Sequence, residues 1–302
     1  MSLRTAQAGF GLLVRRGSDA KSLTKPARRR ILKDVRGLSA DESSALTTIP
    51  TDRLAVYHDL VLGGHQTMIR YALGTTLDAL ALVQKSKPRL ARRETFAATI
   101  EAFLADRRGP ATHSVRELAQ VFAAFMRRRF SAAFKAFPAL RELAQFELAE
   151  LAVELETDGP GRHATEADFA RLAGGTLHAL LRTRLRRPSY ERRFAFKTDV
   201  IGLLRSLRAE PPRARIADLS RPGPCSVVLV RDAIKLAPVR HDLAAAAFRD
   251  LGRMPSDKAF RAEDLAVLRA RRGPRGETEE VAAGRTATEL FTWLRNGLLL
   301  LA

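Results

Sequence analysis

The chain has 302 residues, of which 46% are hydrophobic, so it can bury a sizeable core and is not globally disordered. Its aromatic content of 6% argues against an all-β sandwich, because strands are enriched in aromatic and β-branched residues. The net charge of +19 predicts an acidic or polyanionic partner, unless it reflects an Arg-rich surface that is solvated and has no partner.

Residues 1–50 form a basic N-terminal segment with an early apolar stretch followed by KPARRRILKDVR. We interpret the basic run as a mobile arm or a short surface helix. No small-residue cleavage site follows the apolar stretch, so we expect no signal peptide. The single cysteine, Cys225, excludes an intramolecular disulfide and is typical of a reducing compartment, which predicts a cytoplasmic location. The terminal LLLLA is too short to span a bilayer, so we expect no membrane partner.

From Thr51 onward the apolar spacing predicts a multi-helix domain over residues 51–207. Thr51 can cap a first short helix that Gly63 and Gly64 end. Ser114 and Glu117 form a capping-box pattern that starts a later helix, and Pro138 starts the helix PALRELAQFELAELAVELE. The stretch TEADFARLAGGTLHALLRTRLRR predicts a last helix over residues 165–187.

The amino-acid composition changes after this domain. Residues 208–224 are rich in proline and arginine and are interpreted as a linker to a small α+β domain over 225–302. There SVVLVR and AIKLAPV predict a hairpin, Gly252 closes a helix, and Thr286 with Glu289 forms a second capping-box pattern. The predicted fold class is therefore mainly α, with an N-terminal multi-helix domain and a winged-helix-like C-terminal domain.

The sequence offers little catalytic chemistry. Its six histidines form no metal-binding pattern, and Cys225 has no cysteine partner, so we predict no metal site. It has neither a phosphate-binding GxxxxGK[ST] loop nor a GxSxG nucleophile elbow. An independent enzyme is therefore the last of the alternatives.

Glu147 is the unusual ionisable group, because it lies on the apolar face of the helix that begins at Pro138. A carboxylate there is costly unless it is paired, and acid–base catalysis would need a second titratable group. We predict that Glu147 pins its helix to the RLAVY segment through Arg53 or Tyr57, which lie four residues apart.

The apolar run Val227, Val228, Leu229, Val230 and Arg231 suggests a binding surface. If it is an exposed edge strand, a peptide can add to it as a further strand, and nearby basic residues would favour an acidic peptide. The alternative is an ordinary internal strand of the hairpin.

A second candidate surface is the basic stretch LRTRLRRPSYERRF, residues 181–194. Arg182, Arg186 and Arg193 are possible anion contacts, and the interleaved Tyr190 and Phe194 could stack on bases. Pro188 interrupts a helix here, and such a pattern also arises by chance.

The order of these segments resembles a family whose label is "DNA-binding domain" and which includes the partner subunit of methanobactin biosynthesis. The likeness covers residues 51–156 and 225–300. It rests on RLAVY with Arg53 and Tyr57, on the later VRELAQVFAAFM, and on PALRELAQFELA with Pro138, Leu143 and Glu147. The C-terminal VVLVR and WLRNGLL segments are also similar.

The resemblance implies a non-catalytic accessory subunit. Such proteins pair with a TIM-barrel, multinuclear non-haem iron oxidase that modifies cysteines in a ribosomally made peptide. The helical domain would dock on the enzyme, the C-terminal domain would hold the leader of the precursor peptide, and the iron would belong to the oxidase. This chain would hold no cofactor of its own. A DNA-binding transcriptional regulator is the alternative that the positive charge favours.

Overall fold

The computed structural model describes the chain in segments, and structural statements below refer to these: residues 3–15, 24–106, 114–156, 161–232, 237–255, 258–270 and 278–302. The chain divides into two compact units. Unit 1 comprises Met1–Ala144 and Leu207–Leu219, and unit 2 comprises Gln145–Ser206 and Ser220–Ala302. The predicted domain boundaries differ from this division. The border between Ala144 and Gln145 falls inside a helix, and residues 207–219 belong to unit 1 although they follow a part of unit 2.

The first three helices of unit 1 are α1 (Leu3–Arg15), α2 (Lys25–Leu32) and α3 (Ala40–Thr48). They pack with the start of α4 around a buried cluster of Leu13, Val14, Ile31, Leu32, Leu46 and Leu54. Gly9 allows close packing, since a Cβ there would lie 2.8 Å from Leu46 Cδ1. Over the described part of residues 1–50, the mobile-arm interpretation is therefore wrong, because the apolar residues beside the arginines form a core.

Helix α4 runs from Thr51 to Ser86, so Gly63 and Gly64 do not end it. Its N-cap is Pro50, and the predicted side-chain cap by Thr51 is not formed. A glycine inside a helix costs only about 1 kcal/mol relative to alanine, which the packing of a long helix can outweigh. The non-helical backbone lies instead at Leu73, with φ −138° and ψ 26°.

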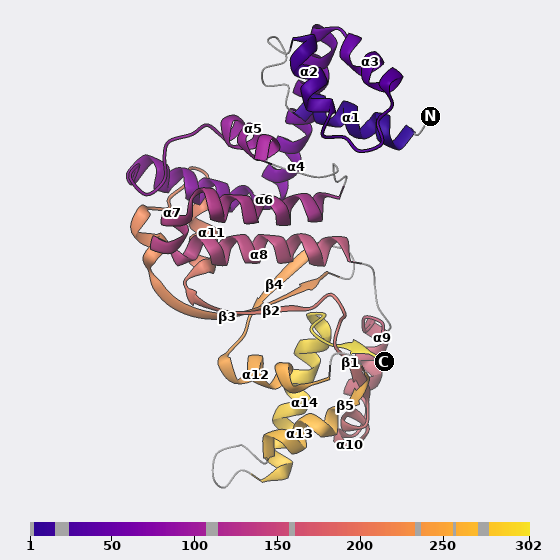
Figure 1. Ribbon diagram of the computed structural model, residues 1–302. Coiled ribbons are helices and arrows are strands. Elements are labelled where there is room, and N and C mark those ends of the chain that lie inside the picture. The colour runs from indigo at the N-terminus through magenta and orange to yellow at the C-terminus, as the bar shows by residue number, and fades with distance from the viewer. Residues whose placement is uncertain are drawn as a thin grey trace. The chain divides into compact units, whose positions relative to one another are not determined.

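The rest of unit 1 is also helical (Figure 1). It contains α5 (Phe96–Asp106), α6 (Val115–Arg129), α7 (Ser131–Ala136) and the start of α8 (Pro138–Leu155). Ser114 caps α6 by accepting from the Glu117 backbone, and the rings of Phe103, Phe122 and Phe125 pack together. The predicted linker is not a free connection: Arg208 Nε donates to Thr75 Oγ1 at 3.1 Å, and Leu219 is buried.

Unit 2 is built on an antiparallel sheet in the order β2–β3–β4. The strands are β2 (Arg192–Thr198), β3 (Pro222–Arg231) and β4 (Pro238–Asp242). The predicted hairpin is confirmed in its pairing, although residues 233–236 lie outside the described segments.

Both faces of this sheet are covered. On one face Phe146 of α8 packs on Phe194 and Phe196, at ring distances of 6.3 and 6.2 Å. On the other face the guanidinium of Arg193 lies 6.0 Å from the ring of Phe248, in α12 (Ala245–Arg253). Consecutive strand residues point to opposite faces, so Val227–Val230 are all buried.

The remaining elements of unit 2 surround a second small sheet in the order β5–β1–β6. Its strands are β1 (Arg184–Arg186), β5 (Phe260–Arg261) and β6 (Leu300–Leu301). The helices of this part are α9 (Glu166–Ala173), α10 (Leu177–Leu181), α13 (Ala262–Ala270) and α14 (Glu279–Arg295). Helix α11 (Val200–Leu207) instead follows β2 and lies by the first sheet, next to Cys225 of β3.

Three sequence predictions fail in this unit. The predicted helix over 165–187 is two short helices and strand β1, because Gly174 and Gly175 separate α9 from α10. Thr286 does not start a helix; it lies within α14 and donates to Ala282 O at 2.7 Å. Gly252 lies inside α12 and does not close it.

The fold is thus mainly helical, with small three-stranded antiparallel sheets. Among the described residues no helix is both long and apolar enough to cross a membrane.

Candidate functional site

The candidate site is a pocket of about 540 Å³ within unit 2. Its walls are residues 163–169, the facing ends of β3 and β4, and residues 295–297 at the end of α14. These parts are far apart in the sequence and are brought together by the two sheets of unit 2. The pocket lies beside β4, which is an outer strand.

The first wall is fixed by Asp168. Its carboxylate accepts from Arg162 Nη2 at 2.8 Å and from the Thr165 backbone at 3.0 Å, while the Thr165 hydroxyl caps α9. The hydrogen bond from the Arg162 guanidinium is the main reason that the pKa of Asp168 lies well below its usual range, and the hydrogen bonds from Thr165 are the next. The backbone of Arg162 also exchanges two hydrogen bonds of 2.9 Å with Leu301, which ties this wall to β6.

Two residues of the lining, His163 and Arg231, contact the buried Tyr190. His163 Nε2 lies 3.0 Å from the hydroxyl of Tyr190, and the Tyr190 ring lies 4.9 Å from the Arg231 guanidinium. Arg231 Nη1 also donates to the Glu156 carbonyl. Gly297, with φ +67°, permits this arrangement, because a Cβ there would lie 3.3 Å from His163 Cε1.

The pocket carries charges of both signs. Arg231 and Arg295 are its cations, and Arg295 lies 5.3 Å from the Phe169 ring; Glu166 and Asp232 are its carboxylates. His241 is half-buried, and its Nε2 is buried with no hydrogen-bond partner among the described residues. Burial lowers the pKa of His241, opposed by the Asn296 backbone and Asp242, so the ring is neutral near pH 7.

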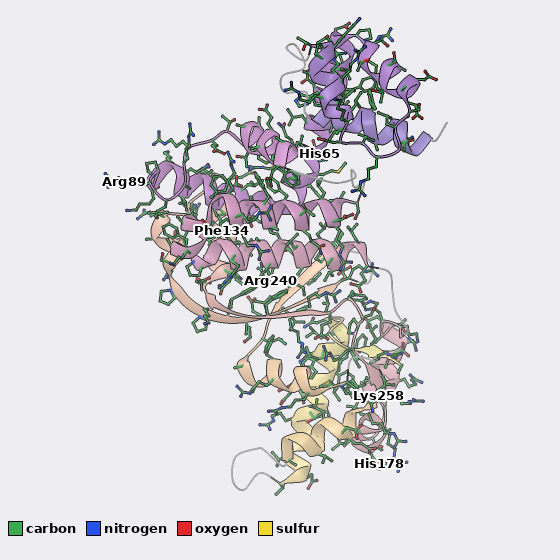
Figure 2. All side chains as sticks on the ribbon, in the orientation of Figure 1. His65, Arg89, Phe134, His178, Arg240 and Lys258 are labelled. Atoms are coloured by element: carbon green, nitrogen blue, oxygen red, sulfur yellow. The ribbon has the colours of Figure 1, made fainter. Side chains whose placement is uncertain are left out.

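The outer edge of β4 follows from its ladder with β3. Asp232 N donates to Ala237 O at 2.8 Å and Leu243 N donates to Ser226 O at 3.0 Å, which fixes the alternation of the pairs. In an antiparallel ladder every second residue directs its N–H and C=O away from the partner strand. On β4 these residues are Pro238, Arg240 and Asp242. Proline has no N–H, so Arg240 and Asp242 are the two that direct both backbone groups outward (Figure 2 labels Arg240).

This arrangement suits binding. Across the described segments, no cluster of three His, Cys, Asp or Glu residues could hold a metal ion. The thiol of Cys225 lies 3.8 Å from Thr198 O, and burial raises its pKa, which makes it a weak nucleophile. An outer strand beside a pocket lined by arginines, histidines and two carboxylates can accept an extended chain whose side chains are polar or charged.

The predicted edge strand, Val227 to Arg231, is wrong in its position. These residues are strand as predicted, but β3 is central, with β2 on one side and β4 on the other. Its backbone groups are therefore engaged, and Val227–Val230 are fully buried, so no peptide can add to it. Arg231 is the one member of this set that lines the pocket.

The structure gives the positions of the residues that the sequence analysis grouped with Glu147. Pro138 begins α8 and Leu143 is buried, as predicted, and Glu147 is 5% exposed. Arg53 and Tyr57 are exposed on α4, and Tyr57 packs edge-on against Phe10 at 5.1 Å. A contact of Glu147 with Arg53 or Tyr57 would join the two units and stays a prediction.

The three arginines predicted as anion contacts do not lie together on one element. Arg182 follows α10, Arg186 lies in β1 and Arg193 lies in β2 of the other sheet, so they share no helix face. Arg193 Nε also pairs with Glu191 at 3.2 Å. Tyr190 is buried and is therefore inaccessible to a base. Phe194 stacks on Phe196, with 5.2 Å between the ring centroids.

Sequence reasoning missed a buried ion pair in this same stretch. Arg187 donates to both carboxylate oxygens of Glu191, at 2.8 and 3.0 Å, and to Met254 O at 2.8 Å. The pair brackets Pro188, so the four-residue spacing did not suggest a helical contact. It missed the pocket as well, since His163, His241 and Arg295 stand in no motif.

No family model and no curated protein matches this sequence.

Proposed function

We propose that this chain is a non-catalytic accessory subunit of a TIM-barrel multinuclear iron oxidase and binds the leader of a ribosomally made precursor peptide. The oxidase and the peptide are inferred from the family resemblance. One structural observation supports a binding role: β4 is an outer strand with outward backbone groups beside a pocket that contains Arg231 and Arg295. In this proposal the chain supplies no catalytic residue, and the iron is held by the oxidase.

The leader would pair with β4 as a fourth strand. Main-chain bonds to Arg240 and Asp242 would supply affinity, and side chains at alternate leader positions would reach the neighbouring pocket. Arg231 and Arg295 would each offer a cation to an acidic leader side chain, beside the pocket's own Glu166 and Asp232. Residues 225–302, with β2 and residues 163–169 of the pocket, would then serve as the peptide-recognition module that the resemblance implies.

Arg240 provides a direct test. Its N–H points away from β3, so Arg240→Pro removes an outward donor without removing a bond of the β3–β4 ladder. We expect Arg240→Pro to weaken binding of a fluorescein-labelled leader peptide by about tenfold or more. Arg240→Ala is the matched control, because it removes the same charge but keeps the N–H. Equal loss in the two variants would contradict strand addition.

The partner is tested by co-expressing the full chain with each multinuclear iron oxidase and precursor peptide encoded in the same genome. A complex that co-elutes in size-exclusion chromatography is the expected result. Two separate peaks at micromolar concentration would contradict the accessory role, whatever the leader experiment gives.

The alternative is a DNA-binding transcriptional regulator, which the net charge of +19 favours. It predicts sequence preference over competitor DNA and an affinity that falls steeply with salt. A helix-turn-helix at α2–α3 would place α3 in the major groove of DNA. Helix α3 does not suit that role, because it contains Asp41 and Glu42 and no basic residue. Weak binding without sequence preference, lost near physiological salt, would reject this alternative.

A further inference from the structure

Helix α4 has a face that its own unit leaves uncovered. Val56, Leu60 and Tyr71 are 59%, 64% and 61% exposed, which is unusual for large apolar side chains on a single helix. The opposite face of the same helix is buried in unit 1 through Leu54, His58, Ile69 and Ala72. The exposed residues therefore form one stripe that points away from the core.

Gly63 and Gly64 lie in the middle of this stripe, next to His65, which Figure 2 labels. Among the described residues, a Cβ added to either glycine would meet no further atom within 4 Å, so packing against that part of the chain does not require them. Glycine weakens a helix relative to alanine, and two in succession leave the helix backbone open on this side. Such a gap lets a second helix approach closely.

The stripe has a two-fold arrangement. Val56 and Tyr71 lie equally far from the glycine pair in opposite directions along α4, and so do Leu60 and Thr67. At about 3.6 residues per turn, all six residues fall within roughly 50° of one direction. The stripe ends before Leu73, where the helical backbone is interrupted. An antiparallel copy of the same helix would therefore present a matching surface, as an isologous interface requires.

The charges beside the stripe fit the same arrangement. Asp59 and Arg70 are both exposed, lie on the same flank, and stand on opposite sides of the glycine pair. In an antiparallel pair each Asp59 would face Arg70 of the other copy, twice by symmetry. Arg70 also contacts Asp78 of its own chain at 2.7 Å, and a guanidinium has enough donors for both carboxylates.

From these observations we infer that the chain forms a two-fold dimer in which α4 packs antiparallel on α4 of a second copy, with the helices closest at Gly63 and Gly64. The interface does not involve β4 or the pocket of unit 2. It is therefore independent of the proposed leader binding.

The test is sedimentation equilibrium of the full chain over a range of micromolar concentrations. The wild type is expected to dimerise, and Gly64→Leu to be monomeric because its side chain fills the gap between the helices. Gly284→Leu is the matched control, since Gly284 also lies within a helix and a Cβ there meets nothing within 4 Å. Circular dichroism should show both variants folded.

Two further variants test the apolar and charged contacts. Leu60→Arg should raise the dimer dissociation constant by about tenfold or more, whereas Val281→Arg, at a similarly exposed apolar position of α14, should not. Asp59→Arg should weaken the dimer, and less so at high salt. A monomeric wild type, or a Gly64→Leu dimer as tight as wild type, would overturn the inference. So would a Leu60→Arg variant that dimerises normally but loses the oxidase, because the stripe would then bind that partner.

Discussion

At the scale of single residues, His241 is the group whose environment differs most from what its sequence position suggests. Its ring lines the pocket, where the charged or titratable groups are Asp232, Glu166, Arg231, Arg295 and His163, and Asp242 follows it in β4. Burial is the largest influence and lowers its pKa below the ordinary value of 6.5. The folded chain therefore accepts a proton at His241 less readily than the unfolded chain does.

A pH dependence of stability follows. Because the unfolded state binds the proton more tightly, stability contributed by neutral His241 is present above about pH 6.5 and is lost as the pH falls below it. Urea unfolding near pH 7.5 and near pH 5.5 should show a smaller loss for His241→Gln than for wild type. The same substitution at the exposed His178 is the control and should leave the difference unchanged. Identical losses in all three proteins would show that His241 does not titrate in this range.

At the scale of elements, the basic segment near the N-terminus depends on one buried arginine. Arg28 in α2 donates to Thr47 O at 3.3 Å, to Ile49 O, and to Thr51 Oγ1 at 2.6 Å. It thus satisfies carbonyls at the end of α3 and holds the start of α4, while its neighbours Arg29 and Arg30 are exposed.

The expected consequence is a large difference between adjacent arginines. Arg28→Met should lower the free energy of unfolding by about 2 kcal/mol, because buried carbonyls lose a charged donor. Arg29→Met and Arg30→Met remove the same charge from solvent and should change it by less than about 0.5 kcal/mol. Urea unfolding of the three variants decides the matter, and similar values for all three would mean that α2 is not anchored through Arg28.

Some elements could be predicted because their signals are local. Pro138 and an apolar stripe gave α8, Ser114 capped α6, and a β-branched run gave β3. Local signals misled where tertiary packing decided the outcome. Gly63 and Gly64 were expected to end a helix, yet α4 continues through them, with residues buried in unit 1 on both sides of the pair, at His58 and at Ile69.

The candidate site was less predictable for a related reason. The residues of β3 were identified, but its position between two strands depends on pairing with β2, about thirty residues away. Edge or centre is a property of that distant pairing and not of the strand's own sequence. The pocket is harder still, because Tyr190, His163 and Arg231 meet only once both sheets exist.

At the scale of the whole molecule, the two units are interleaved along the chain. Residues 207–219 belong to unit 1, although α11 and β3 on either side belong mostly to unit 2. Leu219 is fully buried in this segment, whereas Leu203, sixteen residues earlier, is buried in unit 2. Each unit has its own apolar core, so each can respond separately to a cavity.

The single tryptophan, Trp293, is buried in unit 2, so its fluorescence reports on that unit, while far-UV circular dichroism reports on helices of both. Leu219→Ala and Leu203→Ala should each cost about 3 kcal/mol through lost packing and a cavity. Leu219→Ala should shift the circular dichroism transition to lower urea and leave the Trp293 transition in place. Leu203→Ala should shift the Trp293 transition. If either variant moves both transitions equally, the units unfold as one cooperative structure, because separate cores would confine each cavity's cost to its own unit.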